Sequence, residues 1–126
     1  MSTFLFDSRD DRCKTPFGAV PTDDVVTFRV FLPISYQLRE PALLVYKADR
    51  WDSPERIPMH YEASDGVSCS YTCIFYSPDP QLSFYLFEVA GVNGKMRIAR
   101  DQDGFGVMLP QGGEMWQLTV YDKAMR

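Results

Sequence analysis

Apolar and polar side chains alternate along most of this chain with a period of two residues. In residues 25–32 (VVTFRVFL), Val26, Phe28 and Val30 fall on one face, while Thr27 and Arg29 fall on the other. This period is that of a β-strand with one buried face. Similar runs occupy residues 42–47, 56–61, 68–76, 83–90, 95–100 and 116–121. No stretch of ten or more residues has helical spacing, so the pattern predicts strands almost throughout.

The segments between these runs are rich in turn-forming residues. Asn93-Gly94 separates two alternating runs and predicts a hairpin, because both residues tolerate positive φ. Pro58 indicates an edge strand or a bulge, because proline cannot donate a ladder hydrogen bond. Seven to eight strands at this spacing predict an all-β fold, an immunoglobulin-like antiparallel β-sandwich. A small barrel is the alternative.

The length and composition fit one domain with a substantial core. The chain has 126 residues, of which 45% are apolar and 14% aromatic, so disorder is not expected. We expect a short strand, Thr3–Phe6, and a charged irregular arm, Asp7–Pro16, within residues 1–20. The sandwich is expected over residues 21–122. Residues 123–126 are expected to begin a linker.

Charge, apolar content and cysteine positions indicate the possible partners, the cellular compartment and the redox state of the chain. The net charge is −4, which disfavours binding to nucleic acid. No apolar run approaches the roughly 20 residues of a membrane span, and the N-terminus is too acidic for a signal peptide. We therefore expect a cytoplasmic protein without a membrane partner. Cys69 and Cys73 would lie about 13 Å apart on one strand, too far for a disulfide, and Cys13 is also expected to be reduced.

Motifs for catalysis or metal binding are not found in the sequence. His60 is the only histidine and no G-x-S-x-G occurs, so a hydrolytic triad is not predicted. No C-x-x-C occurs, and neither a metal site nor a cofactor is expected. The segment 101–106 resembles the start of a calcium loop. However, Gly112 stands where such a loop requires glutamate, so a simple turn is favoured.

One aromatic residue is a candidate for ligand binding. Trp51 lies in a predicted polar loop, residues 48–53, between Arg50 and Asp52. A flat aromatic face beside hydrogen-bonding groups suits a sugar ring and equally suits a protein partner. The alternative is that the indole folds back onto its own domain. Candidate carbohydrate-binding residues are Trp51, Tyr46 and Asp49.

Several motifs together resemble a known family. They are Asp7-Ser8-Arg9 with residues 15–20 (TPFGAV), residues 45–49 (VYKAD) with 57–59 (IPM), and residues 116–122 (WQLTVYD). In this order they resemble the N-terminal β-sandwich domain of bacterial α-amylase-family enzymes, glycoside hydrolase family 13. The similar members are neopullulanases, cyclomaltodextrinases and maltogenic amylases, and their N-terminal domain is classed as carbohydrate-binding module family 34. Phe6 stands where that family has histidine.

The resemblance implies a non-catalytic accessory domain of an α-glucan-degrading enzyme. In such enzymes the last strand leads into a catalytic (β/α)₈ barrel of the same polypeptide. The domain packs on this barrel, helps to form the substrate cleft and supports a homodimer. The interface residues implied here are Arg9, Phe17, Trp116 and Tyr121. The alternative is a module that binds starch or maltooligosaccharides by itself. A free-standing enzyme is the third and least favoured hypothesis.

Overall fold

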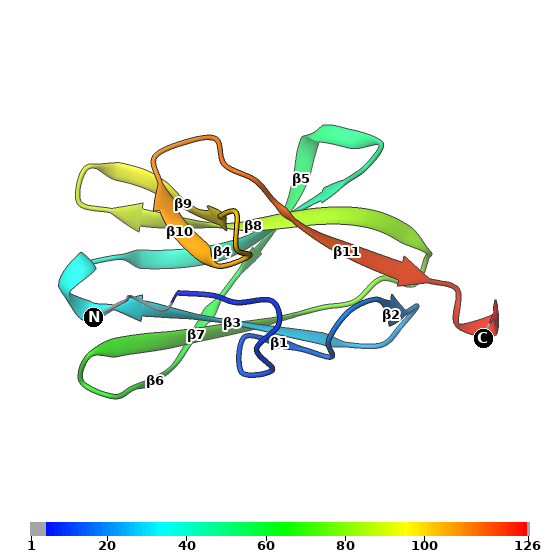
Figure 1. The fold of residues 1–126 in the computed structure, drawn as a ribbon, viewed down its shortest axis with the longest axis horizontal. Coiled ribbons are helices and arrows are strands. Elements are labelled where there is room, and N and C mark those ends of the chain that lie inside the picture. Colours follow the sequence, from blue (N-terminus) through cyan, green and yellow to red (C-terminus); the bar gives the residue numbers. More distant parts are fainter. Residues whose placement is uncertain (1–4, 126) are drawn as a thin grey trace.

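Two β-sheets packed face to face form the computed structural model, which describes residues 5–125 (Figure 1). The smaller sheet has the strand order β1-β3-β7-β6. Its strands are β1 (Lys14–Thr15), β3 (Val26–Pro33), β6 (His60–Ser64) and β7 (Ser68–Phe75). All neighbours in this sheet are antiparallel. The fold is therefore the β-sandwich that the alternating pattern predicts.

The larger sheet is built around the long strand β8 (Gln81–Gly91). One edge of β8 pairs with β4, and its other edge is shared by β11 and β9. The strands of this sheet besides β8 are β2 (Val20–Pro21), β4 (Arg39–Lys47), β5 (Arg50–Pro58), β9 (Gly94–Arg100), β10 (Gly106–Leu109) and β11 (Trp116–Tyr121). Short 3₁₀ turns, η1 (Ile34–Tyr36) and η2 (Lys123–Met125), complete the described elements. The pair β2–β11 is parallel, which the prediction of an antiparallel sandwich did not include.

The inward faces of the two sheets make one core. Val26, Phe28 and Val30 of β3 are fully buried, as their alternation predicts. Tyr85 and Phe87 of β8 meet them from the larger sheet, and the Phe28 and Tyr85 ring centroids lie 4.9 Å apart. Burial of such aromatic side chains supplies most of the stabilisation of a small sandwich. Within residues 5–125, the hydroxyl of Tyr85 is buried without a hydrogen-bond partner.

The N-terminal arm joins the two sheets. The carbonyl oxygen of Leu5 accepts a hydrogen bond from the amide of Phe31 in the smaller sheet, at 3.0 Å. The carbonyl oxygen of Phe6 accepts one from Gly106 in the larger sheet, at 2.8 Å. Both side chains are buried. Leu5 and Phe6 therefore bridge the layers instead of ending the predicted strand Thr3–Phe6, whose first two residues lie outside the described part.

The single strand predicted over residues 56–61 is two strands in different sheets, because the chain changes sheets at Met59. β5 ends at Pro58 and pairs with β4 of the larger sheet, whereas β6 begins at His60 and pairs with β7 of the smaller one. Met59 lies between them with its side chain buried, and its amide donates to the carbonyl of Pro41 at 2.9 Å. The edge position suggested by Pro58 is confirmed, since β4 is the only strand paired with β5 within residues 5–125.

Two connectors were also assigned incorrectly. The predicted loop 48–53 is mostly strand, since β5 begins at Arg50 and only Ala48 and Asp49 form the turn. The predicted connector 101–113 contains β10, which pairs with β9. The hairpin between β8 and β9 is confirmed, with Gly91 paired to Gly94 and residues 92–93 at the turn. Among the described residues, no helix is long and apolar enough to cross a membrane.

Candidate functional site

A row of outward side chains crosses the larger sheet. Phe84 of β8 is the register partner of both Tyr46 on β4 and Gln117 on β11. Its neighbour Tyr85 points into the core, so Phe84 and its partners point outward by strand alternation. Trp51 near the start of β5 extends the row at the sheet edge. Register across β4, β8 and β11 and the ring contacts of Trp51 thus gather these side chains on one surface.

The aromatic rings of this row stack on one another. The Trp51 and Phe84 centroids lie 5.3 Å apart with their planes inclined by 29°. The Trp51 and Tyr46 centroids lie 6.3 Å apart at 28°. Trp51 nevertheless remains 51% exposed. The indole is therefore held against its own sheet, as one alternative proposed, and still offers half of its surface to a ligand.

A groove of about 480 Å³ opens beside Trp51. Trp51, Phe84 and Met115 form its apolar walls, and its polar groups come from Arg100, Glu114 and Gln117. The Arg100 guanidinium donates through Nε to the Met115 carbonyl at 3.2 Å, which holds the guanidinium at the groove. Its Nη2 lies 4.0 Å from Glu114 Oε2. An aromatic wall flanked by charged and amide groups can stack a sugar ring and hydrogen-bond its hydroxyls.

The structure brings together two of the three residues proposed for sugar binding. Tyr46 and Trp51 are in the stacked row, whereas Asp49 lines a different hollow with Asp79 and Leu82. Sequence reasoning missed the other members of the groove, which are Phe84, Arg100, Glu114, Met115 and Gln117. They come from three separate parts of the chain, and only strand register brings them close to Trp51. Identifying them from sequence would have required the pairing of β8 with β4 and β11.

The four predicted interface residues occupy different environments. Phe17 is 69% exposed and Tyr121 is 38% exposed, so both are available to a partner. Arg9 is partly engaged within the domain, donating to the Asp103 carbonyl at 2.8 Å and covering the Phe105 ring. Trp116 is buried, and its indole N–H donates to the Gly104 carbonyl at 3.0 Å. Trp116 thus contributes to the core and offers almost no surface to a partner.

The shifted titrating groups do not form an acid–base pair at the groove. Burial raises the pKa of the Cys13 thiol to about 11 and that of Cys73 to about 12, which disfavours the nucleophilic thiolate. A hydrogen bond from Arg29 lowers the pKa of Glu62, on the smaller sheet. The described residues contain no cluster of three or more potential metal ligands. Asp101 Oδ1 accepts from the amides of Asp103 and Phe105, which confirms the predicted turn.

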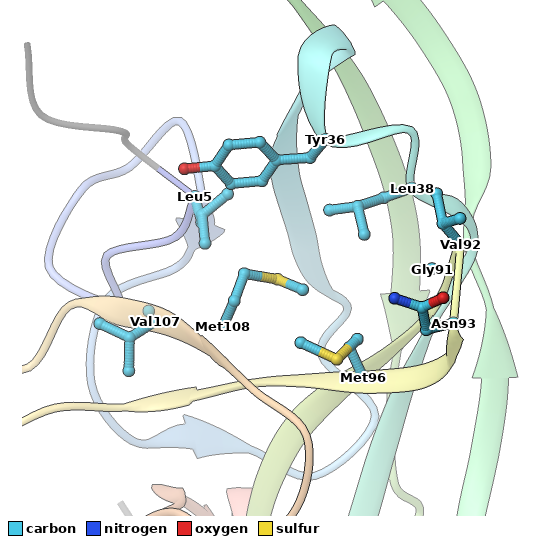
Figure 2. A pocket seen from close by; sticks show the side chains of 10 residues that line it. Leu5, Tyr36, Leu38, Gly91, Val92, Asn93, Met96, Val107 and Met108 are labelled. Atoms are coloured by element: carbon cyan, nitrogen blue, oxygen red, sulfur yellow. The ribbon is translucent and has the colours of Figure 1, made fainter.

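A second hollow, of about 540 Å³, lies at the end of the sandwich near η1. Figure 2 shows that side chains from η1, β9, β10 and the N-terminal arm surround it. The described residues of its lining are mainly apolar, including Leu38, Met96 and Met108, and none of them is charged. This hollow therefore suits apolar contact.

Comparison with solved structures places this fold among known proteins. A structure described as cyclomaltodextrinase aligns with a TM-score of 0.63 and 13% sequence identity, covering 91% of this chain and 18% of that chain. The carbohydrate binding module of the muscle glycogen-targeting subunit of Protein Phosphatase-1 aligns with a TM-score of 0.49 and 14% identity, covering 75% and 72% of the two chains. No protein-family model and no curated protein matches the sequence. The chain thus shares a fold with a small part of a cyclomaltodextrinase.

Proposed function

We propose that this chain is a non-catalytic accessory domain of an α-glucan-degrading glycoside hydrolase. The observation that carries the proposal is the shared fold, which extends over 91% of this chain but only 18% of the cyclomaltodextrinase chain. The motifs at residues 7–20 and 116–122 support the same assignment by their resemblance to the N-terminal domain of such enzymes. In the proposed role the domain precedes the catalytic barrel, packs on it, and supports dimerisation or completes the substrate cleft.

The first test is enzymatic. The protein encoded by the complete reading frame is expected to release reducing sugar from starch, pullulan or cyclodextrins. Residues 1–126, assayed at the same molar concentration, are expected to give only background. Activity of the short chain, or inactivity of the complete protein on all three substrates, would contradict the proposal.

A second function, direct contact with α-glucan, is favoured by the stacked row Tyr46–Trp51–Phe84. An exposed indole fixed by two neighbouring rings loses little conformational entropy when a sugar stacks on it. The adjacent Arg100, Glu114 and Gln117 provide donors and acceptors for sugar hydroxyls. The proposed ligand is a maltooligosaccharide lying across Trp51.

Replacing Trp51 with alanine is expected to weaken maltooligosaccharide binding by about tenfold or more, which corresponds to a loss of roughly 1.5–3 kcal/mol. The fluorescence of the wild-type chain reports binding at Trp51, since Trp116 is buried and should respond little. NMR titration gives the affinity of the variant, which lacks the reporting indole.

Tyr61→Ala provides the matched control for this measurement. Tyr61 is 59% exposed, which is similar to Trp51, but it lies on β6 of the smaller sheet. Its replacement should leave the affinity unchanged. The proposed site would be contradicted if millimolar maltooligosaccharide left the fluorescence spectrum of the wild-type chain unaltered. It would also be contradicted if the wild type and Trp51→Ala bound the sugar with equal affinity.

A further inference from the structure

An apolar surface lies on the outer face of the smaller sheet, away from the Trp51 groove. Val26 pairs with Phe75, and both are buried. Their neighbours Val25 and Tyr76 therefore lie opposite one another on the outer face, together with Ile74. These three side chains are 49%, 58% and 57% exposed, respectively. Neighbouring large apolar side chains at this exposure are typical of an interaction surface.

Phe17 extends this surface at the adjoining edge. Thr15 of β1 pairs with Thr27 of β3, and Phe17 follows two residues later. The buried ammonium of Lys14 donates to the carbonyls of Pro16, at 2.8 Å, and Gly18, at 3.1 Å. These bonds fix the backbone on both sides of Phe17 while its ring remains 69% exposed. We call Phe17, Val25, Ile74 and Tyr76 the β3–β7 patch.

Residues 121–123 lie next to this patch. The carbonyl of Tyr121 accepts from Thr22 at 2.8 Å, and the amide of Lys123 donates to Thr22 Oγ1 at 3.2 Å. Lys123 Nζ lies 3.3 Å from Oδ1 of Asp24, which immediately precedes Val25. Any sequence that follows Arg126 would therefore be separated by three residues from Lys123, which contacts the residue that precedes Val25 of the patch.

We propose that the β3–β7 patch docks the domain that follows residue 126 in the same polypeptide. The inference rests on the proposed function, which places a catalytic barrel there, and it adds the surface through which the two domains meet. A short tether gives such a neighbour an effective concentration in the millimolar range. At micromolar protein concentration this favours the tethered domain over a second copy of the chain. Contacts between domains of one chain typically bury 600–1,500 Å².

Two native tyrosines make a matched test by hydroxyl-radical footprinting with mass spectrometry. Tyr76 is 58% exposed and Tyr61 is 59% exposed, so their reactivities in residues 1–126 should be similar. Tyr61 pairs with the inward Tyr71 and thus belongs to the opposite face of the same sheet. In the protein encoded by the complete reading frame, oxidation of Tyr76 is expected to fall by about fivefold or more, as for a residue buried at an interface. Oxidation of Tyr61 should change by less than about twofold.

A substitution at the patch separates docking from general stabilisation. Ile74→Lys changes an exposed side chain and should alter the stability of residues 1–126 by no more than about 0.5 kcal/mol. In the complete protein, the same substitution is expected to restore the reactivity of Tyr76. Equal reactivity of Tyr76 in the short and complete wild-type proteins would overturn the inference. So would protection of Tyr76 in the short chain at increasing concentration, since that outcome assigns the patch to a second copy.

The activity assay keeps this inference separate from the proposed function. An active α-glucan hydrolase with reactive Tyr76 overturns the docking surface alone. Protected Tyr76 in a complete protein that is inactive on α-glucans supports the surface and overturns the proposed function. A reading frame that stops at Arg126 overturns both.

Discussion

Replacement of Phe6 with alanine is expected to lower the free energy of unfolding by about 3–5 kcal/mol. Phe6 is fully buried, and its ring centroid lies 4.7 Å from those of both Phe87 and Trp116. Truncation removes these contacts and leaves a cavity that the rigid β-layers can fill only partly. Small domains have a total free energy of unfolding of roughly 5–15 kcal/mol. The expected loss is a large fraction of this value, so the variant should contain much more unfolded protein than the wild type.

Phe17→Ala is the matched control for this prediction. Both phenylalanines belong to the N-terminal part of the chain, but Phe17 is 69% exposed. Its loss should change the stability of residues 1–126 by about 0.5 kcal/mol or less. Urea unfolding at neutral pH measures both variants, with equal m-values as the check on two-state behaviour. Similar unfolding midpoints for the two variants would contradict the central position of Phe6.

A rise in pH from 9 to 12 is expected to remove several kcal/mol of stability. Burial raises the pKa of Cys13 from 9.0 to about 11 and that of Cys73 to about 12. Between these values the unfolded chain releases the thiol proton while the folded protein retains it, so rising pH favours unfolding. At about 1.4 kcal/mol for each pKa unit, Cys73 accounts for roughly 4 kcal/mol and Cys13 for roughly 3 kcal/mol.

Two other buried groups modify this pH dependence. Burial also raises the pKa of Tyr85, which adds a contribution of the same sign. Burial lowers the pKa of Lys14 from 10.5, so the folded protein loses that proton first and stability increases with pH over the interval between the two values. The Lys14 contribution opposes those of the two thiols and Tyr85.

Cysteine variants identify the source of the alkaline effect. Urea midpoints at pH 7, 9 and 10.5 under reducing conditions should decrease steeply above pH 9 for the wild-type chain. Cys73→Ala and Cys13→Ala should each flatten that decrease by a similar amount, because both folded-state pKa values lie above pH 10.5, and the double variant should flatten it most. The comparison uses the change in urea midpoint with pH for each protein. A lower stability of either variant at pH 7 therefore does not affect it. An unchanged slope in the double variant would show that the thiols are not responsible.

Strands buried on one face could be predicted from the sequence because burial imposes the alternation. In β3, the residues predicted on one face, Val26, Phe28 and Val30, are all buried, and β8 behaves in the same way with Phe87 and Val89. The first part of β5, residues 50–55, gave no such signal. It lies at a sheet edge with most of its side chains exposed, and the loop predicted around Trp51 is therefore wrong. β10 was missed because glycines and proline surround it. Gly106 is required there, since a Cβ would approach Ile98 Cγ2 to 2.8 Å.

The candidate site could be predicted only in part because it depends on contacts between strands. Tyr46 and Trp51 are close in sequence, and a tight turn brings their rings together. Asp49 is equally close in sequence, but it occupies that turn and faces another hollow. Phe84 and Gln117 reach Tyr46 and Trp51 through the register of β4, β8 and β11, which no local pattern specifies.

The parallel pairing of β2 and β11 has a mechanical consequence. Val20 pairs with Val120 and Pro21 with Tyr121, and the bond from Thr22 to the Tyr121 carbonyl continues the contact. Tension that reaches β2 from the N-terminal side and β11 from the C-terminal side slides the two strands in opposite directions along their length. The hydrogen bonds between them lie across the direction of pull and share the load, so they must break together. We therefore expect this short pair to be loaded in shear when the domain is extended from its two ends.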